Sequence, residues 1–133
     1  MEGYRRIVAG IIEREGQVLI GKKKDDPGHY LSNEWHIPGG KAFPEETDEQ
    51  ALTREMREET GLEVKIERFI DESFHEESRR WVRWYVCTPL TDKLDPKDDL
   101  VDAKFIPRKD VLSIYNQMGV SLMPPKVIEY FRS

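Results

Sequence analysis

The most constraining feature of this chain is the segment from Thr47 to Gly61, because it contains the signals for both ends of a short helix. Thr47 and Gln50 have the spacing of a capping box, so the helix is expected to begin at Thr47. Gly61 is expected to end it as a left-handed C-cap. Leu52 and Met56 lie one helical turn apart and predict an apolar stripe that packs on a core.

Three glutamates share one face of this predicted helix. Glu55, Glu58 and Glu59 stand at positions i, i+3 and i+4. Like charges at these spacings repel each other, and the negative end of the helix dipole adds to the repulsion. A bound divalent cation would resolve the conflict, and carboxylates of this kind suit Mg2+. The sequence therefore predicts a metal site on this face.

Apolar runs on both sides of the helix predict strands. The expected strands span residues 5–14, 17–24, 35–37, 64–73, 80–89 and 103–106. We expect Pro38-Gly39-Gly40 to stop the third strand, residues 92–102 to form a charged loop, and helical turns to occupy 110–117 and the end of the chain to about Arg132. This order predicts an α/β sandwich around a mixed sheet, with residues 1–133 forming one domain.

Composition excludes several classes of protein. The chain has 133 residues with 21 Lys and Arg, 26 Asp and Glu, and a net charge of -5, so no polymeric nucleic-acid partner is indicated. Cys87 is the sole cysteine, which excludes an intrachain disulfide and favours a cytoplasmic setting. The apolar run from Ile7 to Ile12 is too short to span a bilayer, and we expect no signal peptide or membrane anchor.

A longer motif surrounds the glutamates. Five residues separate Gly40 from Glu46, and seven more precede the run Arg54-Glu55-Met56-x-Glu58-Glu59-x-Gly61-Leu62. This pattern resembles the Nudix box of Nudix hydrolases, with every fixed position filled. The resemblance implies a Nudix-type α/β/α sandwich with a mixed β-sheet. It also implies cleavage of a diphosphate linkage in a nucleoside diphosphate joined to another group, with Mg2+ or Mn2+ held between the carboxylates and the substrate phosphates.

The resemblance assigns roles within the motif. Glu58 and Glu59 are the expected direct metal ligands, and Glu55 is a third ligand or a partner of metal-bound water. The carbonyl of Gly40 can join the metal shell. Arg54 is expected to pair with Glu58 and to orient a catalytic glutamate rather than touch substrate. Glu46 precedes the helix and can also be explained by the positive end of the helix dipole.

The general base is open to several assignments. Some Nudix hydrolases draw it from a carboxylate in a loop well after the box. Asp99 lies in such a loop and is our choice, although Asp95, Asp98 and Asp102 compete with it. Glu58 acting on a water molecule is an alternative that requires no loop residue.

Several side chains outside the motif are candidates for substrate contacts. Lys23 and Lys41 are predicted to reach the phosphates, because MutT-type members carry basic residues near these places. Four aromatic residues are candidates for stacking on a base: Trp35, Phe74, Trp81 and Tyr85. The three histidines lack the spacing of metal ligands and are assigned to the surface or to loops: His29, His36 and His75.

The sequence does not identify the substrate. Marks of ADP-ribose, diadenosine-polyphosphate and NADH cleavage are absent beyond the box, which favours a MutT-like nucleotide pyrophosphohydrolase acting on a nucleoside di- or triphosphate derivative. A nucleotide-sugar or dinucleotide pyrophosphatase and a non-catalytic nucleotide-sensing Nudix module are the alternatives. Many Nudix proteins are dimers, so a homodimer is an open alternative, although no residue pattern marks an interface.

Overall fold

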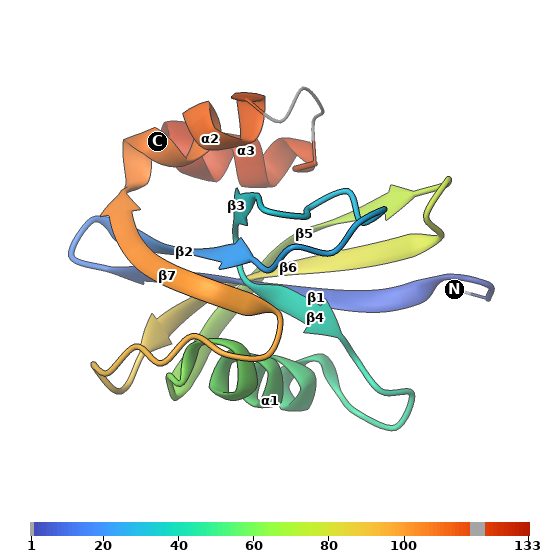
Figure 1. Cartoon of the computed structure of the whole chain (residues 1–133), viewed down its shortest axis with the longest axis horizontal. Coiled ribbons are helices and arrows are strands. Elements are labelled where there is room, and N and C mark those ends of the chain that lie inside the picture. Colours follow the sequence, from blue (N-terminus) through green and yellow to red (C-terminus); the bar gives the residue numbers. More distant parts are fainter. Residues whose placement is uncertain (1, 118–121) are drawn as a thin grey trace.

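The computed structural model describes residues 2–117 and 122–133 of the chain (Figure 1). Its elements are β1 (Arg5–Arg14), β2 (Gln17–Lys23), β3 (Trp35–His36), β4 (Gly39–Lys41), α1 (Asp48–Thr60), β5 (Val64–His75), β6 (Arg80–Pro89), β7 (Leu100–Pro107), the 3-10 turn η1 (Arg108–Asp110), α2 (Val111–Gln117) and α3 (Pro125–Arg132). Among these residues, no helix is long and apolar enough to cross a membrane.

The seven strands form one mixed sheet in which β1 makes the central pairings. The main order is β3-β2-β1-β6-β5, with β4 paired to β1 and β7 paired to β2. β1 and β6 run parallel from the pair Arg5 and Arg80 to the pair Ile12 and Cys87. The other strand pairs are antiparallel. The mixed sheet predicted from the sequence is therefore confirmed.

Helices cover the two sides of the sheet, as Figure 1 shows, with α1 on one side and α2 and α3 on the other. Alternation along β1 explains how one strand serves both sides. Val8 and Ile12 pack in the core beneath α1, with Leu52 and Met56 of the helix. Ile11 packs in the second core, beneath α2 and α3. The predicted α/β/α sandwich is thus confirmed.

Two predicted boundaries were wrong. Residues 39–41 do not merely stop a strand; they form β4, which pairs with Ile7, Val8 and Ala9 of β1. A side chain at Gly39 would place its Cβ 2.6 Å from the carbonyl oxygen of Val8, so this strand requires glycine where the sequence pattern suggested only a turn. The predicted charged loop is also shorter than expected, because β7 already begins at Leu100.

Candidate active site

Helix α1 begins and ends where the sequence predicts. The hydroxyl oxygen of Thr47 accepts from the backbone N–H of Gln50 at 3.1 Å, and Oε1 of Gln50 accepts from the N–H of Thr47 at 3.0 Å. Gly61 closes the helix with φ 77°. Leu52 and Met56 are fully buried. These caps and the apolar stripe fix which way the glutamate face points.

The first turn of α1 is tied to the sheet through Asp48. Its carboxylate accepts hydrogen bonds from the guanidinium groups of Arg6 on β1 and Arg83 on β6. The hydroxyl of Tyr85, also on β6, donates to the same carboxylate. Hydrogen bonds to a charged carboxylate are stronger than those between neutral groups, so they hold the helix in register with both strands.

Glu55 is buried against the backbone of β4. A Cβ atom at Gly40 would lie 2.2 Å from Oε2 of Glu55, so the carboxylate occupies space that only glycine leaves open. Burial raises the pKa of Glu55, and the charges of Glu58 and Asp99 add to this effect. The structure thereby brings together two box positions, Gly40 and Glu55, that are well separated in the sequence.

Arg54 joins the three glutamates Glu46, Glu55 and Glu58. Its Nε donates to Glu46 at 2.7 Å, and its NH1 donates to Glu55 at 2.9 Å and to Glu58 at 3.2 Å. Its NH2 donates to the carbonyl of Lys41 at 3.0 Å. The predicted pairing of Arg54 with Glu58 is present, and the same side chain ties the loop before the helix to the helix. Glu46 therefore has a specific partner, and its pKa falls to about 2 mainly through the hydrogen bonds from Arg54.

Glu59 and Glu58 occupy different surroundings. The side chain of Glu58 is 46% exposed, whereas Glu59 is buried. Burial, followed by the charges of Asp99, Glu55 and Asp98, raises the pKa of Glu59 to about 8. A backbone hydrogen bond from Asp99 lowers it only in part.

The loop after β6 docks on the last turn of α1. The N–H of Asp95 donates to the carbonyl of Thr60 at 2.8 Å, and the N–H of Lys97 donates to the carbonyl of Glu59 at 3.1 Å. A Cβ at Gly61 would lie 2.7 Å from Cβ of Asp95, so the loop packs directly against the C-cap. These hydrogen bonds satisfy carbonyls at the helix end that would otherwise lack partners. They also place Asp99 next to Glu59 on the glutamate face.

These groups suit a hard divalent cation in chemistry. Glu55 and Glu59 are buried carboxylates whose ionisation is opposed by burial and by neighbouring carboxylates, and Glu58 lies on the same helix. Oxygen ligands of this kind are those that Mg2+ prefers. In residues 2–117 and 122–133, however, no three His, Cys, Asp or Glu side chains converge closely enough to form a ready metal cage. Arg54 supplies part of the compensating positive charge in this arrangement.

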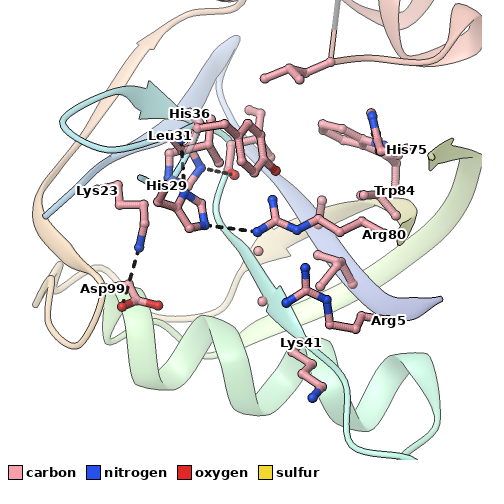
Figure 2. Close-up of a pocket in the computed structure, with 18 of the residues that line it drawn as sticks. Arg5, Lys23, His29, Leu31, His36, Lys41, His75, Arg80, Trp84 and Asp99 are labelled. Carbon is pink, nitrogen blue, oxygen red and sulfur yellow. Dashed lines mark hydrogen bonds and ion pairs between the residues drawn. The ribbon is translucent and has the colours of Figure 1, made fainter. Parts of the chain in front are cut away.

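A cavity of about 230 Å3 is lined in part by Gly40 and Asp99, which contact Glu55 and Glu59 respectively (Figure 2). Gly40, Lys41, Lys23 and Asp99 line it, so four residues assigned from the sequence meet at one pocket. Lys23 is buried, and its Nζ lies 3.6 Å from Asp26 and 3.7 Å from Asp99. The carboxylate of Asp99 is also 3.3 Å from Nζ of Lys24. The structure therefore distinguishes Asp99 from Asp95, Asp98 and Asp102 by its place in the pocket wall.

Comparison with known proteins places this geometry in a family. A family model described as the NUDIX domain matches residues 3–123. The chain belongs to the NUDIX domain family. Within that family it is 35% identical over 83 residues to the CTP pyrophosphohydrolase of Escherichia coli K12, a match that covers 60% of each chain. It is 45% identical over 58 residues to the putative 8-oxo-dGTP diphosphatase 2 of Mycobacterium tuberculosis H37Rv, covering 44% of this chain and 40% of that one. These matches span less than two thirds of the relatives' own lengths.

Solved NUDIX structures share the fold. A NUDIX hydrolase from Nitrosomonas europaea superposes with a TM-score of 0.75 at 18% identity, covering 96% of this chain and 88% of that one. A MutT protein from Methanosarcina mazei Go1 superposes with a TM-score of 0.69 at 19% identity, covering 99% and 94%. At these identities the likeness supports the fold alone.

The aromatic residues predicted to stack on a base lie elsewhere in this NUDIX chain. Phe74 and Trp81 stack on each other with ring centroids 6.0 Å apart, Tyr85 bonds to Asp48, and the ring of Trp35 lies under Lys104. None of the four predicted aromatic side chains lines the cavity, where Tyr30, Trp84 and Tyr115 lie instead. The prediction of these stacking residues therefore finds no support in the pocket.

The assignment of the histidines to the surface or to loops was wrong for His36. This residue lies on β3, is 8% exposed and lines the cavity. Its Nδ1 lies 2.8 Å from the carbonyl oxygen of Ile37, and burial lowers its pKa. Since a carbonyl can only accept, Nδ1 carries the proton in this contact. His29 and His75 line the same cavity from a loop and from the end of β5.

Sequence reasoning also missed Arg5 and Arg80. Both line the cavity, as Figure 2 shows, and they approach each other because β1 and β6 pair in parallel. An arginine at the start of each predicted strand was the available signal, but the sequence does not reveal that these two strand starts are neighbours.

Proposed function

We propose that this protein is a Mg2+-dependent NUDIX hydrolase that cleaves a diphosphate linkage in a nucleoside di- or triphosphate derivative, most simply as a MutT-like nucleotide pyrophosphohydrolase. The observation that carries the proposal is that Gly40, which packs against the carboxylate of Glu55, lines one cavity together with Lys23, Lys41 and Asp99. Similarity to the E. coli CTP pyrophosphohydrolase supports a nucleotide as substrate.

The residues of the box have distinct proposed roles. Glu55, Glu58 and Glu59, with the carbonyl of Gly40, would hold Mg2+ or Mn2+ beside the cavity. When bound, such a cation neutralises phosphate charge and lowers the pKa of a coordinated water. Arg54 is a positioning residue, because its contacts are to glutamates and to a backbone carbonyl. Its guanidinium keeps the carboxylates of Glu46, Glu55 and Glu58 close together in the absence of substrate.

The cavity residues supply positioning and proton transfer. Lys23 and Lys41 would contact substrate phosphates, which phosphoryl transfer requires for charge neutralisation. Lys23 is held between Asp26 and Asp99, so its ammonium has a defined place. Asp99 is the proposed general base, since its carboxylate lines the cavity and its backbone N–H bonds to Glu59. Glu58, exposed at the edge of the helix face, is the competing base.

The decisive experiment is a substrate panel. The purified chain is incubated with Mg2+ and nucleoside triphosphates, diphosphates, nucleotide sugars and dinucleotides, and the release of pyrophosphate, phosphate and monophosphate is followed. We expect a monophosphate product, and reaction in 18O-labelled water identifies the phosphorus attacked. Glu58→Gln should lower kcat by about two orders of magnitude or more with the fold retained, and Glu129→Gln on α3 is the matched control.

The alternatives give different outcomes. Turnover confined to nucleotide sugars or dinucleotides would replace the MutT-like assignment. Nucleotide binding without turnover of any compound would identify a sensing module. Asp99→Asn and Glu58→Gln compared across pH separate the two candidate bases, because only loss of the true base removes the acidic limb of the kcat/KM profile.

A further inference from the structure

Two arginines, Arg5 and Arg80, stand side by side on the wall of the cavity opposite Lys23 and Asp99. The parallel register of β1 and β6 places Arg5 directly opposite Arg80. Like charges at directly opposed positions of a sheet destabilise it. The charge of Arg5 accordingly helps to lower the pKa of Arg80, after the larger effect of burial. This pair is the cationic counterpart of the crowded glutamates on α1.

Neither arginine has a carboxylate partner within the part of the chain that the structure describes. Arg5 donates to the backbone carbonyl of Ser78 at 3.0 Å. The guanidinium of Arg80 lies over the ring of Tyr30, 4.3 Å from its centroid, and its Nε is buried with no acceptor among the described residues. Stacking on an aromatic ring fixes the plane of the guanidinium without satisfying its N–H groups.

Among the described residues, His29 is the side-chain acceptor that Arg80 reaches, and a second donor competes for it. NH2 of Arg80 lies 3.1 Å from Nε2 of His29, and the backbone N–H of Leu31 lies 3.0 Å from Nδ1 of the same ring. A guanidinium and a backbone amide can only donate, whereas a neutral imidazole has one acceptor nitrogen. His29 can therefore satisfy one of these two donors, and Arg80 remains short of acceptors.

The charge of the cavity wall indicates which kind of ligand would supply the missing hydrogen-bond acceptors. Arg5, Lys23, Lys41 and Arg80 line the cavity, and among the described lining residues Asp99 is the acidic one, in a chain with net charge -5. Asp99 is engaged by Lys23. Figure 2 shows Arg5 and Arg80 reaching into the cavity on the side opposite Lys23 and Asp99, with His29 between the two groups. Planar guanidinium groups in this setting match the paired oxygens of a phosphate.

We propose that Arg80, supported by Arg5, forms a phosphate-binding site in this cavity, distinct from the carboxylate face of α1. The inference rests on the proposed function for its substrate, and the phosphate has two sources: the polyphosphate tail of the bound nucleotide or the released pyrophosphate. Arg80 supplies paired donors, Tyr30 holds the guanidinium plane, and the phosphate relieves the repulsion between the two arginines.

The test compares Arg80→Gln with Arg79→Gln. Arg79 is the preceding residue, exposed and paired with Glu76, so its substitution removes the same charge outside the cavity. Binding of inorganic pyrophosphate is measured by calorimetry in metal-free buffer, where the helix glutamates cannot hold it through a cation. We expect Arg80→Gln to weaken binding about tenfold or more and to reduce its salt dependence, and Arg79→Gln to change it less than about twofold.

Steady-state hydrolysis with Mg2+ distinguishes the two phosphate sources. A rise of about tenfold in KM for nucleoside triphosphate in Arg80→Gln, with kcat nearly unchanged, assigns the site to the substrate tail. Weaker product inhibition by pyrophosphate with unchanged KM assigns it to the product. Arg80→Lys retains the charge but not the planar guanidinium, so its pyrophosphate affinity and KM should lie between those of the wild type and Arg80→Gln. If Arg80→Gln does not fold, the same measurements are made on Arg80→Lys.

Other results overturn the proposal. Pyrophosphate affinity and KM both unchanged in Arg80→Gln would remove Arg80 from phosphate binding, whether or not the protein hydrolyses nucleotides. Arg80 would also be removed from phosphate binding if Arg80→Gln weakened only the binding of the phosphate-free nucleoside. If the wild type hydrolyses no nucleotide but binds pyrophosphate through Arg80, the phosphate site stands and the proposed function fails.

Discussion

Replacing Glu59 by glutamine should stabilise the metal-free protein in alkaline buffer. Burial and the neighbouring carboxylates raise the pKa of Glu59 to about 8, above its ordinary value of 4.5. The folded protein therefore binds this proton more tightly than the unfolded chain does. The wild type loses stability as pH rises from about 4.5 to about 8, and the full cost is present above pH 8.

The size of this effect follows from the pKa difference. At about 1.4 kcal/mol per pKa unit, the shift sets a ceiling of about 5 kcal/mol. The carboxylate of Asp99, which is the largest charge acting on Glu59, is itself 57% exposed and screened by water. We therefore expect Glu59→Gln to raise the free energy of unfolding by about 2–3 kcal/mol at pH 9 and by close to zero at pH 4.5. Glutamine keeps an oxygen that can accept from the N–H of Asp99.

Urea denaturation at pH 4.5, 7 and 9 in EDTA measures the difference, with Glu129→Gln on α3 as control. Mg2+ at about 100 times Kd should cancel most of the difference at pH 9, because such binding stabilises the wild type by about 3 kcal/mol. A variant that is less stable than the wild type at pH 9, or a difference independent of pH, would refute the electrostatic argument.

Three further predictions concern other parts of the site. Arg54→Ala should destabilise the fold by about 3 kcal/mol in urea titrations, because it leaves Glu55 buried without its cation; no loss of stability would contradict this. Gly40→Ala should abolish turnover but leave a folded protein by circular dichroism, because the added Cβ clashes with a movable carboxylate. In Gly39→Ala the added Cβ meets backbone atoms, so this variant should have a lower Tm. Equal effects of the two variants on turnover and Tm would contradict the assignment. Thr47→Ala should cost about 1 kcal/mol, measured by thermal melting, and Thr47→Ser should restore it.

Local patterns predicted the helix, its caps and the face that carries the glutamates. The capping box, the apolar stripe and the spacing of the glutamates all concern residues within one or two turns of each other, so the sequence states their geometry directly. The same holds for β6, whose bounds from Arg80 to Pro89 agree with the prediction. The pairing of Arg54 with Glu58 follows from helical spacing alone.

Contacts between distant segments were beyond reach. The neighbourhood of Arg5 and Arg80 depends on the parallel register of β1 and β6, which neither strand's sequence encodes alone. His36 lies on a strand of only two residues that pairs with β2, and the sequence of so short a strand does not reveal this pairing. The distinction between Glu58 and Glu59 was also hidden, because it arises from the docking of a loop that comes much later in the chain.

Because of that docking, the length of the loop determines where Asp99 lies on the cavity wall. The backbone N–H groups of Asp95 and Lys97 donate hydrogen bonds to the carbonyls of Thr60 and Glu59 at the end of α1. Asp99 lies two residues after Lys97. Inserting a single residue next to the exposed Lys93 would leave both bonds in place. Inserting one between Lys97 and Asp99 would instead shift the aspartate along the cavity wall, with both bonds still formed. Homologous chains that vary in loop size should therefore place their extra residues ahead of the first bond.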